Sequence, residues 1–564
     1  MENLERGKMG EIKEKEIEWE EGTLKPTLTQ FPERRKEFKT PSGIMKKVVY
    51  TPADLEGLDY VRDLGFPGKY PFIRGPHAAM FRSQLWIIRQ QMGVNRSEET
   101  REIEDTLMEE GLDAPLIDLD TCQKMCHSSD EPYVKERTGY AGVVLDTLDD
   151  FRRVWGGLDL SKVHLAVNDS SVGFITFPMY AAVVEEQGIP AGKVKMTMQN
   201  DSLADFTTSN YNRYPPKHHM RLSVDTMEYM AKTYPKSNIL AFVGQFYRQT
   251  GATAVQEVAF AMSDAIAYIE ELVKRGLNID DFAQRITYQS GGGIDFFEEI
   301  AKHRASRRVW ARIMKERFKA KDERSCRLKT YVLTPGQTLT TSQPLNNIPR
   351  GTIECLAAVL GGATSIEVTP FTEGITIPTS ADVWKVGLRL QQIIAYESGV
   401  ADVVDPMGGS YYMEYLTNKM DEEIMRYIEK IDEMGGIIGA IKYGFLEKEM
   451  NRNNYEEKRL IDEGENVVIG VNMFKEEEEG DGEYEVYAPD PKLIGAQIER
   501  IAKIKKERDN IKLDEIMGRL KKAAETDQNV TPIVIEAVKA YATVGEIGSA
   551  MEDVFGKFNK ALLY

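Results

Sequence analysis

Short β-rich runs alternate with helical runs across the middle of the chain, and this alternation restricts the fold more than any other feature of the sequence. Such alternation is typical of βα units around a parallel sheet. Eight runs favour a (β/α)8 barrel over an open doubly wound sheet, and no Gly-x-Gly-x-x-Gly motif follows any of them. The predicted strands are 72–74, 115–120, 163–169, 193–200, 238–245, 285–290, 328–334 and 365–369.

Most of these runs finish in a side chain that forms hydrogen bonds. In a barrel the carboxyl ends of the strands meet on one face, where barrel enzymes place their active sites. This convergence predicts an enzyme. The polar residues at or just after the predicted strand ends are His77, Asp118, Asp120, Asn168, Asp169, Gln199, Asn200, Asp201, Gln245, Tyr288, Gln289, Thr334, Glu367 and Thr369.

The presumed inward positions of the strands are unusually small or polar for a barrel core. A barrel filled by such residues would be underpacked and would bury unpaired polar groups. A long, thin ligand with amides of its own, lying along the barrel axis, would remove both problems. The alternative is a strand register that is wrong by one residue, which would turn every side chain to the other face. The inward positions are Ala166, Asn168, Thr197, Gln199, Ala241, Gly244, Arg285 and Thr287.

The rest of the chain divides into a charged N-terminal arm, 1–41, and a mostly helical region, 401–564, on either side of the barrel, 42–400. Within the helical region we expect a short strand at 467–471 and an acidic surface loop at 475–482. The net charge of −18 argues against nucleic acid as a partner. Four cysteines without a metal-ligand spacing and the lack of a long apolar run predict a cytoplasmic protein with no metal site and no membrane segment.

Several ordered motifs resemble the adenosylcobalamin-dependent acyl-CoA mutases, in particular the family of methylmalonyl-CoA mutase and 2-hydroxyisobutyryl-CoA mutase. The resemblance extends from about residue 45 to the end of the chain. The motifs are Tyr50-Thr-Pro, Leu64-Gly-Phe-Pro-Gly68 with the following Lys-Tyr-Pro-Phe-Ile-Arg-Gly-Pro, Trp86-Ile-Ile-Arg-Gln90, Gln199-Asn-Asp201, Tyr214-Pro-Pro216, Gly251-Ala252, Asp405-Pro with Gly408-Gly-Ser410, and Thr543-Val-Gly-Glu546.

The resemblance implies a barrel threaded by the pantetheine arm of coenzyme A, with radical chemistry of adenosylcobalamin at its C-terminal face. None of the six histidines lies in the Asp-x-His-x-x-Gly loop of the corrinoid-binding domain, so no such domain is expected in this chain. The chain would then be the large, catalytic subunit of a hetero-oligomer. A separate small subunit would supply most of the cobalamin site, and the C-terminal helical region would be its docking surface.

Residue roles follow from the resemblance position by position. Thr197, Gln199, Arg285 and Thr287 match residues that contact the thioester end and the pantetheine, and Arg89 matches an arginine that contacts coenzyme A. On the cofactor side, the resemblance assigns Glu373 to the adenosyl ribose and includes Ala141.

Five positions depart from methylmalonyl-CoA mutase. Gln91 and His77 stand where that enzyme has tyrosines, and Ser209 stands where it has an arginine that clamps the substrate carboxylate; a serine offers no charged bidentate fork. Phe246 replaces the usual thioester-binding histidine. Asp118 resembles the acid of 2-hydroxyisobutyryl-CoA mutase that accepts a hydrogen bond from the substrate hydroxyl.

These departures make a hydroxylated, branched or bulky substituted acyl group the preferred prediction over methylmalonyl. Gln245 or Tyr247 would then replace the missing histidine as the hydrogen-bond donor. One alternative is a true methylmalonyl-CoA mutase in which a protonated His77 binds the carboxylate. The other, suggested by Phe246, is a catalytically weak scaffold that binds partner subunits.

Overall fold

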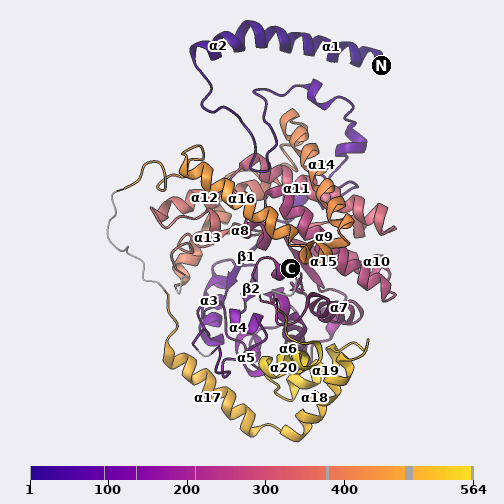
Figure 1. Ribbon diagram of the computed structural model, residues 1–564, viewed down its shortest axis with the longest axis vertical. Coiled ribbons are helices and arrows are strands. Elements are labelled where there is room, and N and C mark those ends of the chain that lie inside the picture. The colour runs from indigo at the N-terminus through magenta and orange to yellow at the C-terminus, as the bar shows by residue number, and fades with distance from the viewer. Residues whose placement is uncertain are drawn as a thin grey trace.

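Eight parallel strands form the centre of the protein (Figure 1). The computed structural model describes residues 2–94, 96–134, 136–209, 211–376, 380–476 and 487–559. The strands pair in the order β4-β3-β2-β1-β8-β7-β6-β5. They are β1 Ile87–Met92, β2 Ala114–Asp118, β3 Leu165–Asn168, β4 Met196–Met198, β5 Leu240–Val243, β6 Ile286–Gly291, β7 Lys329–Leu333 and β8 Ser365–Glu367.

The two ends of this sheet, β4 and β5, also meet. The backbone N–H of Asn238 donates to the carbonyl of Met196 over 2.8 Å, and that of Ala241 donates to the carbonyl of Gln199 over 3.1 Å. These bonds close the sheet on itself, so the predicted (β/α)8 barrel is confirmed.

The first barrel strand was predicted in the wrong place. Residues 72–74 form a buried loop, and the first strand is β1, Ile87–Met92. Phe72 has a φ of +63°, which no strand accommodates. The guanidinium of Arg307 donates to the carbonyls of Phe72 and Ile73 over 2.9 and 2.7 Å, so the backbone groups of this segment are bound by a side chain rather than by a neighbouring strand. The other seven predicted runs each overlap an observed strand, with ends that differ by a few residues.

Helices surround the barrel and continue beyond it (Figure 1). None of those in the described ranges has both the length and the apolar run that crossing a bilayer requires. Figure 1 shows α1 standing off from the barrel at one end of the molecule. The larger helices are α1 Glu2–Trp19, α3 Ser97–Glu109, α5 Leu148–Trp155, α6 Gly173–Glu186, α7 Pro216–Thr233, α9 Ala254–Lys274, α11 Phe296–Arg312, α12 Asn347–Leu360, α13 Ala381–Glu397, α14 Tyr411–Glu433, α15 Gly436–Lys442, α16 Phe445–Asp462, α17 Pro491–Glu507, α18 Asn510–Ala524, α19 Thr531–Lys539 and α20 Val544–Phe555.

The C-terminal helices cover the barrel from two sides. α14 packs on α9 and α11, whereas α19 packs on α6. α6 is buried along almost its entire length, and α5, α7 and α19 pack against it. The strand predicted at 467–471 is wrong: this segment makes a single isolated bridge between Ile469 and Met473. Most of the predicted acidic loop, 477–482, lies outside the described residues.

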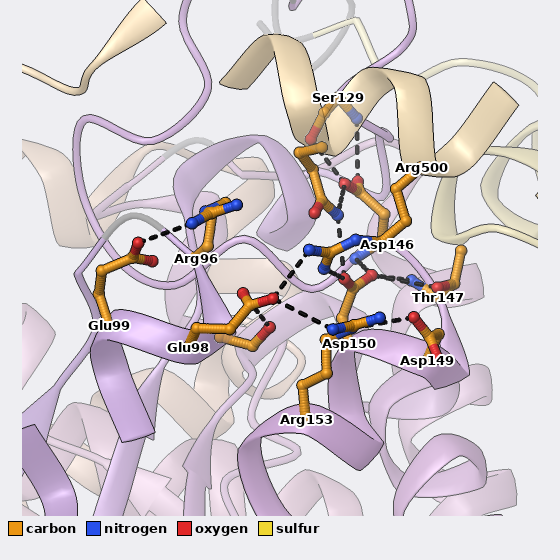
Figure 2. Close-up of polar contacts among 12 residues, drawn as sticks. Arg96, Glu98, Glu99, Ser129, Asp146, Thr147, Asp149, Asp150, Arg153 and Arg500 are labelled. Carbon is orange, nitrogen blue, oxygen red and sulfur yellow. Dashed lines mark hydrogen bonds and ion pairs between the residues drawn. The ribbon is translucent and has the colours of Figure 1, made fainter. Parts of the chain in front are cut away.

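A buried polar network fixes α17 to the barrel side of the molecule (Figure 2). The amide of Gln497 donates to Asp146 over 2.9 Å and to Asp150 over 3.1 Å. Arg500, one turn later, donates to Asp150 over 3.2 Å and to Glu98 on α3 over 2.8 Å. Burial raises the pKa of Asp150 to about 6, and the bonds from Gln497 and Arg500 partly oppose that shift. The α17 part of the C-terminal helical region is therefore held by directional contacts as well as by apolar packing.

Two of the family-like motifs have structural roles. The Asp405 carboxylate binds Arg74 over 3.0 Å and also pairs with the buried Arg304. Thr543 and Glu546 form the capping box that begins α20. These motifs tie the C-terminal region to the barrel and do not reach the cavities described below.

The buried Glu104 on α3 gives a prediction about stability. Neither carboxylate oxygen has a hydrogen-bond partner among the described residues, and burial raises the pKa of Glu104 to about 8. The unfolded chain has an ordinary pKa near 4.5, so stability falls between about pH 4.5 and pH 8, by about 1.4 kcal/mol per pH unit. Glu104→Gln should therefore raise the melting temperature at pH 8 and change it little at pH 5, as measured by thermal unfolding. The exposed Glu102→Gln on the same helix is the control, and a gain in stability independent of pH would contradict the assignment.

Candidate active site

A cavity of about 560 Å³ runs along the barrel axis; we call it the axial cavity. Barrels are normally filled here by branched apolar side chains. The inward register predicted from the sequence is confirmed at six positions, because Ala166, Asn168, Thr197, Gln199, Ala241 and Thr287 all line this cavity. Lys329, Ile87 and Ser365 are the first residues of their strands and also line it, so the cavity reaches the N-terminal end of the barrel.

The axial cavity carries positive charge, since no acidic residue is among the described side chains that line it. Arg89 and Lys329 contribute the cations, and His77 and His164 add imidazole groups. Burial and the neighbouring Arg327 lower the pKa of Lys329 to about 8, and burial lowers the pKa of His164 to about 3, helped by Arg89 and Lys329. These depressed values indicate a site that an anionic ligand would stabilise.

One nitrogen of Arg89 also lacks the hydrogen-bond partner that a ligand could provide. Its Nε donates to Ser365 Oγ over 3.0 Å, whereas Nη1 is buried with no hydrogen-bond partner among the described residues. A buried guanidinium N–H without an acceptor costs free energy, of the order of 1–3 kcal/mol. A polar ligand in the axial cavity would remove that cost.

A layer of side-chain amides separates the axial cavity from the strand ends; we call it the amide layer. The amide of Asn168 donates to Gln91 over 2.6 Å. Gln199 donates to Gln289 over 3.3 Å, and Gln289 donates to Gln245 over 2.7 Å. Since the oxygen of Gln245 is occupied, its NH₂ group is directed away from Gln289. A ligand that extends from the axial cavity to the strand ends would therefore meet the hydrogen-bonding groups of the amide layer.

Beyond the amide layer lies a second cavity of about 340 Å³, the strand-end cavity. It contains most of the side chains that the sequence predicted to face the acyl group or the cofactor. Burial raises the pKa of Glu373 to about 7, with Asp118 adding to the shift, and burial raises the pKa of the neighbouring Glu367 to about 8. The predicted residues that line it are Gln91, Asp118, Ala141, Ser209, Gln245, Phe246 and Glu373.

Two predicted site residues reach neither cavity. The Tyr247 side chain is fully buried, and its hydroxyl donates to Asp264 over 2.9 Å. The guanidinium of Arg285 donates to the backbone carbonyls of Asp281, Ala231 and Tyr234. The structure therefore does not bring Tyr247 to the strand-end cavity or Arg285 to the axial cavity. His77 lines the axial cavity rather than the strand-end cavity.

Among the residues that sequence reasoning missed are three basic cavity residues: Lys124, His164 and Lys329. Lys329 had a signal, because it lies two residues before Tyr331 in a predicted strand and so shares its inward face. His164 directly precedes β3 and bonds Thr197 over 3.0 Å. Lys124 ends the one-turn helix α4, Thr121–Lys124, and no periodic pattern predicts its direction.

A closed parallel barrel with an axial channel and a polar cavity at its strand ends defines a (β/α)8-barrel enzyme for an elongated substrate. The chain belongs to the methylmalonyl-CoA mutase family, whose model matches residues 39–557. Members of this family are isomerases that act on coenzyme A thioesters and depend on adenosylcobalamin.

Three relatives illustrate the relationship. The 2-hydroxyisobutanoyl-CoA mutase large subunit of Aquincola tertiaricarbonis is 36% identical over 548 residues, which cover 97% of each chain. The methylmalonyl-CoA mutase of Rhizobium meliloti is 34% identical over 92% of this chain and 73% of its own length. The human mitochondrial methylmalonyl-CoA mutase is 35% identical over 92% of this chain and 69% of its own length.

Proposed function

We propose that this chain is the large subunit of an adenosylcobalamin-dependent acyl-CoA mutase that rearranges the carbon skeleton of a hydroxylated, branched or bulky substituted acyl group. The observation that carries the proposal is the axial cavity ending at the amide layer, with the strand-end cavity beyond it. This arrangement suits a molecule with a long polar arm on one side of a thioester and a reactive acyl group on the other.

The axial cavity would hold the pantetheine arm and the adjoining part of coenzyme A. Pantetheine carries its own amides, which match the polar groups of Thr197, Thr287 and Asn238 on the wall. The cations Arg89 and Lys329 and the imidazole of His77 would bind the polar and anionic parts of coenzyme A, and an anion near Lys329 would raise its pKa from about 8 towards the ordinary range.

The amide layer would hold the thioester. Gln245 takes the role for which the family uses a histidine, because its NH₂ group is free of Gln289 and its side chain lines the strand-end cavity. Gln199 is fixed from behind, since its oxygen accepts bonds from the backbone N–H and the hydroxyl of Ser170 over 2.8 and 2.9 Å. Because the donors of the amide layer are held rigidly, they would orient the thioester carbonyl with little rearrangement of the protein.

The strand-end cavity fits the adenosyl side of the family's cofactor. The Glu373 carboxyl is reached from the cavity and has no hydrogen bond to another described residue, so it can accept bonds from ribose hydroxyls. Ala141 and Gly142 contribute small residues to the wall of the same cavity. When bound, adenosylcobalamin supplies the radical that starts and ends the rearrangement. The chain's own residues would position the acyl group and keep water from it.

The acyl group is proposed to be other than methylmalonyl. Ser209 provides no cation, and its hydroxyl already donates to Asp205 over 2.7 Å. Methylmalonyl-CoA is the second candidate, favoured by the relatives that carry this name and by the presence of Lys124 in the strand-end cavity. His77 lines the axial cavity and lies on the wrong side of the amide layer to bind a substrate carboxylate. An open axial cavity counts against a scaffold without activity.

A separate small subunit would supply most of the cobalamin site, as the name of the Aquincola relative suggests for that protein. We propose the helical region 401–564 as its docking surface, the barrel region 42–400 as the substrate-binding part, and 1–41 as an arm. The four cysteines are all free and buried, which is typical of proteins from reducing compartments and supports a cytoplasmic location.

Reconstitution tests the proposal. The chain is combined with a cognate small subunit and adenosylcobalamin, and isomerisation is followed by mass spectrometry on a panel of hydroxylated, branched, substituted dicarboxylic and methylmalonyl thioesters. We expect turnover of at least one of the first three groups. Exchange of methylmalonyl-CoA and succinyl-CoA alone would support the second candidate. No isomerisation of any thioester, with binding of coenzyme A retained, would favour the scaffold.

A further inference from the structure

Lys124 is the only cationic side chain among the described residues that line the strand-end cavity. It lies at the end of α4, six residues after Asp118 ends β2. Its Nζ is 2.6 Å from Asp118 Oδ1, and the two side chains are 8% and 22% exposed. A salt bridge therefore forms part of the wall against which the acyl group would lie.

The pair presents a donor and an acceptor side by side with no net charge. Burial would lower the pKa of Lys124, but Asp118 and the ring of Tyr211, whose centroid is 5.7 Å from Nζ, more than compensate and the pKa is raised. The ammonium group has three N–H donors, and its bond to Asp118 uses one of them. The remaining donors and the second oxygen of Asp118 make no hydrogen bond to other described side chains, which leaves them to a ligand.

This combination suits a hydroxyl group on the substrate. A hydroxyl has one donor, which Asp118 would accept, and two acceptor lone pairs, one of which Lys124 would fill. A carboxylate would gain Lys124 but would lie beside Asp118, and burying it against a pair of zero net charge leaves it without a counter-charge. A substrate ammonium group could donate to Asp118 but would lie beside the positive charge of Lys124. The pair thus favours an uncharged group that both donates and accepts.

Acceptance of a substrate hydroxyl by Asp118 is what the resemblance already implies. We propose that Lys124 is a specificity-determining residue, which donates to the same hydroxyl and, paired with Asp118, disfavours acyl groups that carry a free carboxylate. The inference rests on the function proposed above and refines its substrate class. Ser209 is uncharged and its hydroxyl already donates to Asp205, and the oxygen of Gln91 already accepts from Asn168.

Equilibrium binding to the large subunit in complex with its small subunit, without turnover, tests the proposal. The probes are a 2-hydroxyacyl-CoA, the matching branched acyl-CoA without the hydroxyl, methylmalonyl-CoA, and coenzyme A. The wild type should bind the hydroxyacyl thioester most tightly. Asp118→Asn removes the negative charge and should tighten methylmalonyl-CoA binding by about tenfold or more. Lys124→Met leaves Asp118 unpaired and should weaken the hydroxyacyl thioester about tenfold relative to its branched analogue.

Two further variants make the outcome decisive. The double variant Asp118→Asn with Lys124→Met should lose the hydroxyl preference while still binding the branched thioester. Lys274→Met, at the end of α9, removes an exposed lysine that lies 3.2 Å from Glu271, outside both cavities and the proposed docking surface, and should change no ratio of affinities. Retained binding of coenzyme A shows that each variant is folded.

Contrary results are distinct from one another. If the wild type prefers methylmalonyl-CoA and Lys124→Met abolishes that preference, Lys124 is a carboxylate clamp and the proposal is overturned. Binding of all thioesters with equal affinity overturns the selectivity but leaves the proposed function intact. If no thioester binds the wild type, the proposed function fails as well.

Discussion

Ala241→Phe is expected to abolish binding of acyl-CoA thioesters while leaving the fold intact. Ala241 lies on β5, is 6% exposed, and faces the axial cavity. A phenyl ring at this position would occupy the space through which we expect pantetheine to pass. Overpacking a filled core costs about 1–3 kcal/mol, but here the ring enters open space, so the loss of stability should be smaller. The dissociation constant should rise at least about 100-fold, equivalent to about 2.7 kcal/mol.

A series of side chains of increasing size at position 241 distinguishes loss of binding caused by a blocked cavity from loss caused by a damaged fold. Ala241→Val and Ala241→Leu should weaken binding in order of side-chain size, as measured by calorimetric titration. Ala496→Phe, at an exposed position on α17, adds the same ring far from the barrel axis and should have no effect on binding. Unchanged affinity in Ala241→Phe would mean that the ligand does not follow the axial cavity.

Gln245→Leu is expected to lower kcat by about 10²–10³-fold with little change in KM, as removal of one preorganised donor does in other enzymes. Leucine keeps the approximate size of the side chain but removes the NH₂ group proposed to bind the thioester oxygen. It also removes the acceptor for Gln289, a bond of 2.7 Å within the amide layer. Steady-state kinetics of the reconstituted enzyme measure the effect.

Tyr247→Phe is the matched control for Gln245→Leu. The Tyr247 hydroxyl bonds Asp264 over 2.9 Å in the core, away from both cavities, so its loss should lower the melting temperature and leave kcat almost unchanged. An equal fall of kcat in Tyr247→Phe would show that the strand end rotates during turnover and that the tyrosine is the donor after all.

The barrel could be predicted from the sequence because seven of its strands carry the expected local pattern between helical runs. The first strand could not, because residues 72–74 and 87–92 are similar in composition. The two segments differ in a long-range contact, since Arg307 binds the carbonyls of Phe72 and Ile73 in the folded chain. Local patterns carry no information about a partner more than two hundred residues away.

Site residues could be predicted where they lie on strands, because alternate residues of a strand face the same side. Thr197, Ala241 and Thr287 face the axial cavity because alternate residues of a strand share a face. Lys124 was not predictable in this way, since a one-turn helix after a strand has no period to read. Tyr247 is a third case, because α8, Gln245–Thr250, turns adjacent residues in different directions. Gln245, Phe246, Gln249 and Thr250 line the strand-end cavity, whereas Tyr247 does not.

The amide layer has a consequence for how substrates of different size would be handled. If the thioester is held at the height of Gln245, the pantetheine arm acts as a ruler that places every acyl group at the same starting point. The pantetheine arm and the acyl group would then be bound by separate sets of residues. Substitutions on α4 and α8 could then change which acyl group is bound without affecting the pantetheine site. A few side chains beyond the amide layer would be enough to adapt the barrel to a different thioester.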